Sequence, residues 1–291
     1  MNELLRRTRI IIADGAMGTE LQAAGLPAGA CGELWNQQHP ERVRRVHEAY
    51  VAAGAEVLLT NTFGGSRSAL ERHDAAHQVA AINRAAAQNA LRAAGDTAWV
   101  LGDIGPLGGF LEPLGETPRE VAHEAFREQA EALLGAHVDG IIIETMSALD
   151  ELEVAVAAAR AAGARLVVGS VCFENTRVGL RTMTGATCSA VAEKLTELNV
   201  DVLATNCGTR LSASDYAQIV RAYREVNDTA PVLVKMNAGS PRLVGEQTVY
   251  DMAPDEFAAA LPRLIDAGTD IIGGCCGTGP QHVRALARAL A

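Results

Sequence analysis

Residues 139–163 read DGIIIETMSALDELEVAVAAARAAG and contain one complete pattern of strand, turn and helix. The run Ile141–Ile143 is typical of a buried parallel strand, because its apolar residues do not alternate with polar ones. Glu144 and Thr145 begin a polar turn, and an alanine-rich segment with helical periodicity follows. The segment ends at Ala162-Gly163, where glycine fits the left-handed residue that commonly closes a helix. This stretch therefore predicts one β/α unit.

The same pattern recurs along the chain. Its apolar runs are Ile10–Ile12, Val57–Leu59, Trp99–Leu101, Ile141–Ile143, Leu166–Val168, Val202–Leu203, Val232–Val234 and Ile271–Ile272. Ala-Gly junctions recur at 53–54, 94–95 and 267–268, and Thr117-Pro118-Arg119-Glu120 predicts a helix start with threonine as the cap. Eight units predict an α/β fold, a closed (β/α)8 TIM barrel, since no Gly-x-Gly-x-x-Gly follows the first run. No linker divides residues 1–291, which we expect to form one domain.

Composition limits the classes of function. The 291 residues contain 25 Lys and Arg against 35 Asp and Glu, a net charge of −10 that argues against nucleic acid or an anionic membrane as partner. No apolar run approaches the roughly 20 residues of a membrane span, and the start of the chain lacks a signal peptide's apolar segment. Six cysteines are too few for a disulfide-stapled secreted module. We therefore expect a cytoplasmic protein.

In a barrel of this kind, functional residues collect where the strands end. The residues at these ends are mostly polar: Asp14, Thr60, Asn61, Asp103, Glu144, Ser170, Asn206, Cys207, Lys235, Met236, Asn237, Cys275 and Cys276. Any single one of them could simply cap a helix or satisfy backbone groups of a loop. Three cysteines in one such set are harder to explain in that way, and they indicate a metal site.

Cys275 and Cys276 lie in a glycine-flanked run after the eighth strand, and Cys207 follows the sixth. Three thiolates at one mouth suit Zn²⁺, and zinc with three protein ligands keeps a fourth position open, as catalytic zinc does. Such a site suits the activation of a substrate thiol. Two adjacent cysteines are also compatible with buried small side chains or a strained vicinal disulfide. Cys31 and Cys172 are weaker ligand candidates.

Five segments resemble, in order, the signature set of the homocysteine S-methyltransferase family. They are residues 14–21 (DGAMGTEL), 60–63 (TNTF), 144–145 (ET), 206–207 (NC) and 273–278 (GGCCGT). The resemblance extends from about Ile11 to the C-terminus. The family includes the homocysteine module of cobalamin-dependent methionine synthase, betaine–homocysteine methyltransferases and S-methylmethionine-dependent enzymes. The resemblance implies a zinc-dependent barrel enzyme that methylates homocysteine to methionine.

The thiol chemistry can also be argued from the residues. Coordination lowers a thiol pKa from about 8.5, so a bound substrate sulfur is a thiolate near neutral pH. Three protein thiolates and a substrate thiolate around Zn²⁺ carry a formal charge of −2, which keeps the substrate sulfur nucleophilic toward a methyl group. We therefore expect Cys207, Cys275 and Cys276 to be catalytic as well as metal-binding.

The amino-acid part of homocysteine needs an anion site and a cation site. The turn after the first strand consists of Asp14, Gly15, Ala16 and Met17. Besides being a tight turn into a helix, it could hold the carboxylate with free N–H groups. Glu144 ends an apolar strand and could accept from the ammonium group, and the resemblance implies the same two roles. We expect Asp14, Asn61 and Asn206 to orient loops or ligands around the substrate.

The sequence says less about the methyl donor. Five aromatic residues are expected in loops at the mouth: Trp35, Phe63, Phe110, Phe173 and Tyr250. They could hold a quaternary ammonium or sulfonium donor by cation–π attraction, worth about 0.5–2 kcal/mol each, or merely pack the loops. Residues 32–36 and 144–148 resemble bacterial betaine–homocysteine methyltransferase-like proteins. Residues 60–63 instead resemble the methionine synthase module, and Thr145 stands where animal betaine enzymes carry an aromatic residue.

We therefore expect glycine betaine or a related onium compound as donor, with S-methylmethionine or a separate corrinoid protein as alternatives. Because the chain stops at Ala291, we expect no folate or cobalamin module and no C-terminal oligomerisation arm. A metal-dependent aldolase or lyase is disfavoured, since three thiolates make a poor Lewis acid. A non-enzymatic zinc-binding protein is also disfavoured, since a structural zinc has a fourth protein ligand and His282 is the only histidine near these loops.

Overall fold

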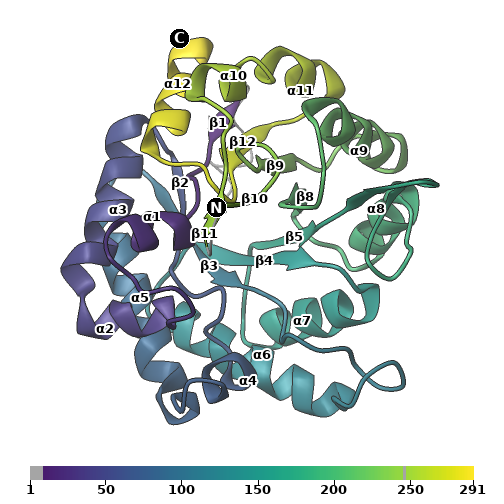
Figure 1. The fold of residues 1–291 in the computed structure, drawn as a ribbon. Helices are drawn as coiled ribbons and strands as arrows, with labels where there is room; N and C mark the ends of the chain where they lie inside the picture. Colours follow the sequence, from purple (N-terminus) through teal and green to yellow (C-terminus); the bar gives the residue numbers. More distant parts are fainter. Residues whose placement is uncertain (1–8, 245–246) are drawn as a thin grey trace.

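The structure is a computed structural model that describes residues 9–244 and 247–291. In this described part of the chain, eight parallel strands form one sheet in the spatial order β1-β12-β9-β8-β5-β4-β3-β2 (Figure 1). The strands are β1 (Ile11–Ile12), β2 (Val57–Leu59), β3 (Trp99–Ile104), β4 (Gly140–Met146), β5 (Val167–Val171), β8 (Val202–Asn206), β9 (Val232–Met236) and β12 (Ile271–Gly274). A bridge between Ala13 and Val57 connects the two ends of the sheet, so the predicted (β/α)8 barrel is confirmed.

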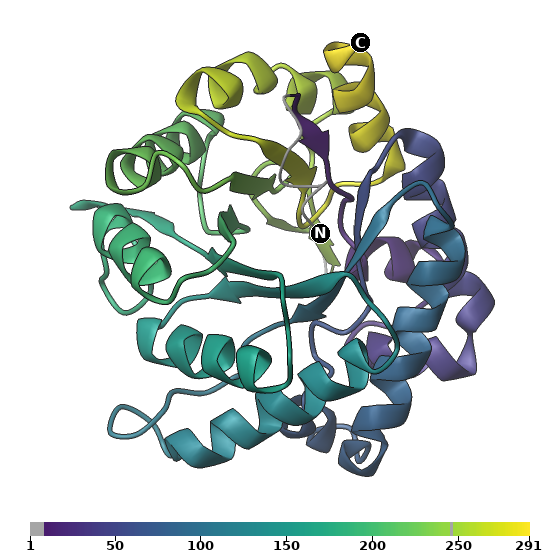
Figure 2. The same ribbon diagram turned by 180° about the vertical axis from the view of Figure 1, so that it is seen from behind.

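Helices surround this sheet on its outer side (Figures 1 and 2). They are α1 (Gly18–Ala23), α2 (Trp35–Gln38), α3 (Pro40–Ala53), α4 (Arg67–Glu71), α5 (Val79–Ala94), α6 (Arg119–Leu134), α7 (Leu149–Ala161), α8 (Cys188–Glu197), α9 (Ala213–Val226), α10 (Pro254–Ala258), α11 (Leu261–Ala267) and α12 (Pro280–Leu290), with short 3-10 helices at Gly32–Leu34 and Ala76–Gln78. None of the helices in the described ranges is long and apolar enough to cross a membrane.

Local signals at the helix ends are mostly as predicted. The glycines at the four Ala-Gly junctions all have positive φ, and those at 54 and 268 are left-handed caps. The predicted cap at Thr117 is wrong, because α6 begins at Arg119 and its N-cap, Pro118, has no side-chain bond. Thr117 instead forms a β-bridge with Leu111, which holds it outside the helix.

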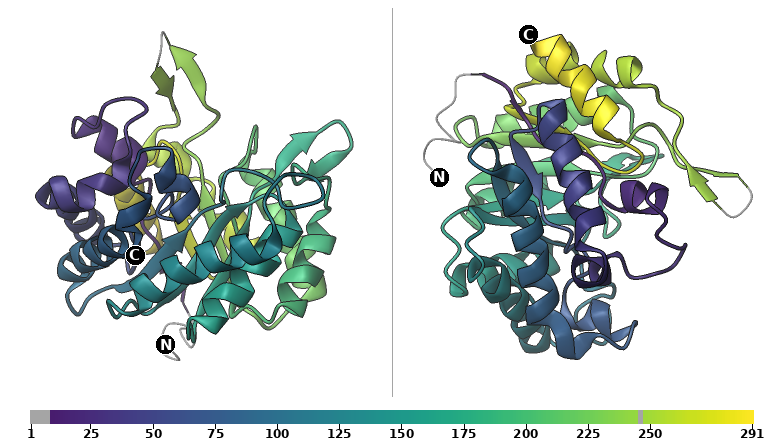
Figure 3. Two further views of the ribbon diagram at one scale, coloured as in Figure 1. Left: turned by 90° about the horizontal axis from the view of Figure 1, so that it is seen from below. Right: turned by 90° about the vertical axis from the view of Figure 1, so that its left-hand side faces the viewer.

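Two hairpins were not predicted. They are β6 (Glu174–Thr176) with β7 (Gly179–Arg181), and β10 (Arg242–Val244) with β11 (Gln247–Val249). Each follows the end of a barrel strand, β5 or β9. Figure 3 shows β10–β11 standing out from the rest of the barrel. Both hairpins therefore lie at the C-terminal face, where the site is expected.

The barrel interior is apolar toward the N-terminal ends of the strands, its lower part, and polar toward their C-terminal ends. Twelve buried side chains fill its lower part: Ile11, Ala13, Val57, Leu59, Leu101, Ile142, Leu166, Val168, Val202, Ala204, Leu233 and Ile271. Because alternate residues of a strand face the same side, the next inward residues are two positions further along. On five strands these are Asp103, Glu144, Ser170, Asn206 and Lys235, all of them buried. We call these five residues the polar layer.

Candidate active site

A cavity of about 530 Å³ opens at the C-terminal ends of the strands. Predicted site residues that line it are Asp14, Gly15, Ala16, Met17, Asn61, Phe63, Glu144, Tyr250, Cys207, Cys275 and Cys276. Asp103 and Lys235 of the polar layer, which the sequence placed at strand ends without assigning them a role, line it as well. The first turn and the ends of β2, β3, β4, β8, β9 and β12 thus contribute to one cavity.

The three cysteines predicted as metal ligands meet in this cavity. The Sγ atom of Cys276 lies 3.8 Å from that of Cys207 and 4.0 Å from that of Cys275. All three Sγ atoms lie within 4.8 Å of one another. Sulfurs bound tetrahedrally at the usual 2.3 Å from zinc are about 3.8 Å apart, so this spacing fits three corners of a zinc site. All six cysteines are free, which excludes the vicinal disulfide in this structure.

The charge of the cluster also fits a metal. Hydrogen bonds from the thiols of Cys275 and Cys276 lower the pKa of Cys207 to about 3. The same contact with Cys207 raises the pKa of Cys276 to about 11, and that of Cys275 is raised too. The lowered pKa favours the thiolate of Cys207, and the thiolate is the form of cysteine that binds metals.

Backbone contacts hold the sulfurs in place. Cys207 has a φ of 55°, which is uncommon for a residue other than glycine. Its N–H donates to the carbonyl of Lys235 at 3.1 Å, and its own carbonyl accepts from the Tyr216 hydroxyl. The N–H of Cys275 donates to Met236 at 2.6 Å, and its carbonyl accepts from the Thr278 hydroxyl at 2.7 Å. The β8 and β12 loops are thus attached to the β9 strand between them.

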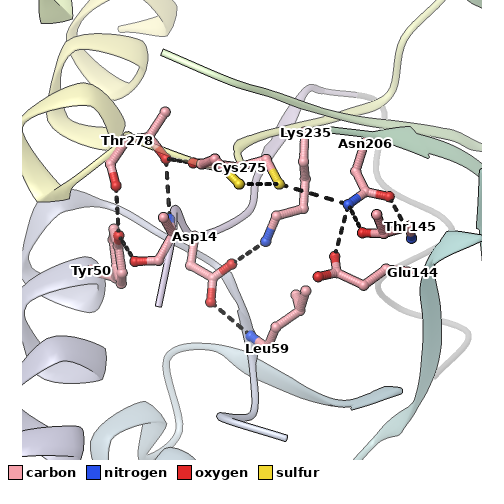
Figure 4. A network of polar contacts seen from close by, with 11 residues as sticks. Asp14, Tyr50, Leu59, Glu144, Thr145, Asn206, Lys235, Cys275 and Thr278 are labelled. Carbon is pink, nitrogen blue, oxygen red and sulfur yellow. Dashed lines mark hydrogen bonds and ion pairs between the residues drawn. The ribbon is translucent and has the colours of Figure 1, made fainter. Parts of the chain in front are cut away.

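The first turn is attached to the loop that follows the last strand. The Ala16 N–H donates to the Thr278 hydroxyl oxygen at 3.1 Å, and the Tyr50 hydroxyl donates to the Ala16 carbonyl at 2.6 Å (Figure 4). Within residues 9–244 and 247–291, the N–H groups of Gly15 and Met17 have no hydrogen-bond acceptor. These two N–H groups are available to an anionic ligand.

Asp14 faces the interior and forms a buried ion pair. Its Oδ1 accepts from Lys235 Nζ at 2.5 Å, and its Oδ2 accepts from the Leu59 N–H at 2.8 Å (Figure 4). Burial raises the pKa of the Asp14 carboxyl, and the Lys235 charge opposes this. For the Lys235 ammonium, burial lowers the pKa, but the charges of Asp14 and Glu144 outweigh it. A lysine at the end of an apolar strand was the signal in the sequence that could have identified this pair.

Glu144 is oriented by Asn206. The Nδ2 of Asn206 donates to Thr145 Oγ1 at 2.7 Å and to Glu144 Oε2 at 3.4 Å (Figure 4). Its Oδ1 accepts from the Thr145 N–H at 2.9 Å and from the Ser170 hydroxyl at 2.6 Å. Burial raises the pKa of Glu144 to about 7, with Lys235 opposing the rise. Asn206 is fully buried beside the cavity, whereas Glu144 lines it.

Some of the remaining predicted residues line the cavity, and the others lie outside it. Asn61 lines the cavity and donates to the Gly32 carbonyl at 2.9 Å. The Phe63 side chain is 42% exposed and lines the cavity, as Tyr250 does. Trp35, Phe110 and Phe173 do not line it. Trp35 is buried against His39, Phe173 is in the core beside Tyr223, and Phe110 lies in the loop between β3 and α6.

The other candidate ligands have separate contacts. Cys31 donates to Glu33 Oε2 at 3.3 Å, and Cys172 donates to the Thr145 carbonyl at 3.6 Å. His282 is buried, with Nδ1 accepting from the Gly279 N–H and Nε2 donating to the Met252 carbonyl, each at 3.0 Å. The sulfur cluster of the described residues therefore consists of Cys207, Cys275 and Cys276.

The fold and site define a (β/α)8 barrel with a cysteine cluster in its mouth, and residues 11–290 match the family model of homocysteine S-methyltransferase. The chain is 34% identical over 302 residues to the methionine synthase of Mycobacterium tuberculosis and 33% identical to that of Mycobacterium leprae. These alignments cover 97% of the chain but only 25% and 24% of the relatives, so it spans about a quarter of their length.

A solved structure supports the fold. The homocysteine methyltransferase MmuM from Escherichia coli, in its metallated form, matches with a TM-score of 0.80 and 24% identity over 98% of both chains. At this level of identity the likeness concerns the barrel fold alone. The family match and the mycobacterial relatives together show that the chain belongs to the homocysteine S-methyltransferase family, a family of methyltransferases.

Proposed function

We propose that this enzyme is a zinc-dependent methyltransferase that converts homocysteine to methionine. The observation that carries the proposal is the cluster of Cys207, Cys275 and Cys276, whose sulfurs have the spacing of a zinc site inside the cavity. These residues would hold the ion through three thiolates. Bound zinc would lower the pKa of the substrate thiol, so that its sulfur is a thiolate near neutral pH. Because such thiols need reducing conditions, we also propose a cytoplasmic location.

The amino-acid part of homocysteine would bind beside the cluster. The unpaired N–H groups of Gly15 and Met17 would donate to its carboxylate, and Glu144 would accept from its ammonium group. Asn206 would orient Glu144 through its bond to Oε2. Asp14 is bonded to Lys235 and Leu59, so it would support the first turn.

The transfer itself needs little help from acids or bases. The homocysteine sulfur attacks the methyl carbon, the new S–C bond forms, and the donor leaves with the electron pair of its former bond to that carbon. A donor that is cationic before transfer leaves as a neutral molecule and needs no proton. The residues of the chain therefore act by binding and orienting the two substrates in line.

For the donor we propose glycine betaine or a related onium compound. This is supported by Phe63 and Tyr250, two aromatic side chains that line the cavity and could contact a cation through their faces. A second candidate is a methyl group delivered by a separate corrinoid protein. The 34% identity to a methionine synthase favours it.

A panel of donors tests both candidates. Zinc-loaded protein is incubated with homocysteine and, separately, with glycine betaine, a dimethylsulfonium compound, S-methylmethionine, S-adenosylmethionine or methylcobalamin, and methionine is measured by mass spectrometry. We expect methionine with betaine or the sulfonium compound. Methionine formed with methylcobalamin and with none of the other donors would support the corrinoid donor instead of an onium compound. A protein that neither binds homocysteine nor makes methionine with any donor would refute the proposal.

A further inference from the structure

Asp103 places a second carboxylate next to Glu144. In the register of the sheet, Asp103 of β3 pairs with Ile142 of β4, and Glu144 lies two residues beyond Ile142 on the same face. Both side chains belong to the polar layer and both line the cavity. Neighbouring strands thus bring two carboxylates to one part of the cavity wall.

The Asp103 carboxylate is buried without a hydrogen-bond partner in the part of the chain that the structure describes. Its side chain forms no hydrogen bond with any residue in the described ranges, its Oδ1 is shielded from solvent, and the residue is only 5% exposed. Its backbone is firmly held, because its N–H donates to Thr60 at 2.9 Å and its carbonyl accepts from Thr62 at 2.6 Å. A buried carboxylate without a partner is costly, so its retention in a cavity points to a ligand.

The other charged and amide groups around it are already paired. Lys235, the cation of the polar layer, donates to Asp14 at 2.5 Å. Asn206 donates hydrogen bonds to Glu144 and Thr145 and accepts one from the Ser170 hydroxyl. Burial and then the charge of Glu144 raise the pKa of Asp103 well above its usual range, although the charge of Lys235 opposes the rise. A small cation with several hydrogen-bond donors would fit beside these two carboxylates.

We propose that Asp103 accepts a hydrogen bond from the α-ammonium group of the substrate, together with Glu144. An ammonium group has three N–H donors, so it can bond to both carboxylates at once. This inference rests on the proposed function and adds a residue to it. It makes the cavity selective for amino-acid thiols over thiols without an amino group.

The test compares homocysteine with 4-mercaptobutyrate, which has the same thiol and carboxylate but no ammonium group. Binding of each to zinc-loaded protein is measured by calorimetry without a methyl donor. Asp103→Asn should weaken homocysteine binding roughly 10-fold or more, as expected for a lost bond to a charged group, and should not weaken 4-mercaptobutyrate binding. Asp139→Asn is the matched control, because Asp139 accepts from Val100 at the opposite end of β3 and does not line the cavity.

A second variant keeps the inference testable if Asp103→Asn does not fold. Glu144→Gln should keep part of the preference for homocysteine over 4-mercaptobutyrate, because Asp103 remains. Complete loss of that preference, or equal weakening of both ligands in Asp103→Asn, would overturn the inference. Unchanged homocysteine binding in Asp103→Asn would also overturn it while leaving the proposed function intact. A wild-type protein that fails to bind homocysteine would instead overturn the proposed function.

Discussion

At the scale of single residues, the cavity concentrates groups that are costly to bury. Cys207 has a left-handed backbone, and Asp14 and Lys235 form an ion pair that is almost fully buried. Asp103 has no hydrogen-bond partner for its carboxylate among the described residues. Residues in such states persist only where the surrounding structure holds them, and they are common at functional sites. In this barrel they all lie at the C-terminal face, beside the sulfur cluster.

Cys276→Ser should abolish the proposed zinc binding. The serine hydroxyl does not ionise as a thiol does, so one of the three ligands is lost and bound zinc should fall well below one per chain. Homocysteine methylation should fall by at least about 100-fold, because even groups that only support a metal ligand contribute 10- to 100-fold. Elemental analysis and a methionine assay measure the two effects. Cys188→Ser, in helix α8 and outside the cluster, is the control and should keep its zinc.

Lys235→Met should destabilise the protein through Asp14. Losing the lysine leaves the Asp14 carboxylate buried without its cation, which typically costs about 3–5 kcal/mol. The double variant Lys235→Met/Asp14→Asn should recover most of this loss. Urea unfolding measures the free energy of unfolding of each. Arg288→Met, which breaks an exposed pair with Asp255, should cost less than about 1 kcal/mol. Equal effects of the two lysine variants would contradict the electrostatic explanation.

At the scale of elements, the loop between β12 and α12 determines where Cys275 and Cys276 lie. Gly277 has a φ of 78°, and a Cβ atom added there would lie 2.2 Å from the Cβ of Tyr250. Thr278 in the same loop bonds to the first turn and to the Cys275 carbonyl. The loop therefore joins the sulfur cluster, the proposed carboxylate site and the Tyr250 ring in one structure.

Gly277→Ala should disturb this loop more than backbone strain alone predicts. The new methyl group meets Tyr250, so the loop must shift and move the Cys276 sulfur. We expect a loss of about 1–3 kcal/mol in stability and weaker zinc binding. Gly163→Ala is the matched control, since Gly163 also has positive φ, at 97°, but open space around its Cβ position. Calorimetry and zinc titration with a chelator measure both effects. Zinc binding as strong in Gly277→Ala as in Gly163→Ala would contradict the role of the loop.

At the scale of the whole molecule, the proposed zinc ion should couple distant parts of the chain. Cys207 and Cys276 are 69 positions apart, and their sulfurs meet only because β8 and β12 lie on either side of β9 in the folded barrel. A ligand that binds the folded state alone stabilises it by mass action. The metal should therefore stabilise the entire barrel as well as the loops that hold it.

Removing the metal should lower the melting temperature. Free zinc at about 1,000 times its dissociation constant contributes about 4 kcal/mol, which corresponds to roughly 8–16 °C for a domain of about this size. Scanning calorimetry of zinc-loaded and chelator-treated protein measures the difference. Cys276→Ser should show almost no change on chelation. A wild-type melting temperature that is insensitive to zinc would contradict binding at this cluster.

The eight strands could be predicted from the sequence, because each apolar run and its following turn are local features. The sequence also showed which residues lie at or near the C-terminal ends of the strands, so Cys207, Cys275, Cys276 and Glu144 could be assigned to one mouth, although β4 continues past Glu144 to Met146. The sulfur cluster was predictable because its residues follow directly from that topology.

The pairing and direction of the side chains could not be predicted from the sequence, because they depend on contacts made in the folded barrel. The Asp14–Lys235 pair and the position of Asp103 beside Glu144 depend on the register between strands that are distant in sequence. Among the five aromatic residues, only Phe63 and Tyr250 line the cavity, because packing against other loops and helices sets the direction of each ring. A strand end specifies a face of the barrel, whereas contacts across the barrel specify which side chains meet there.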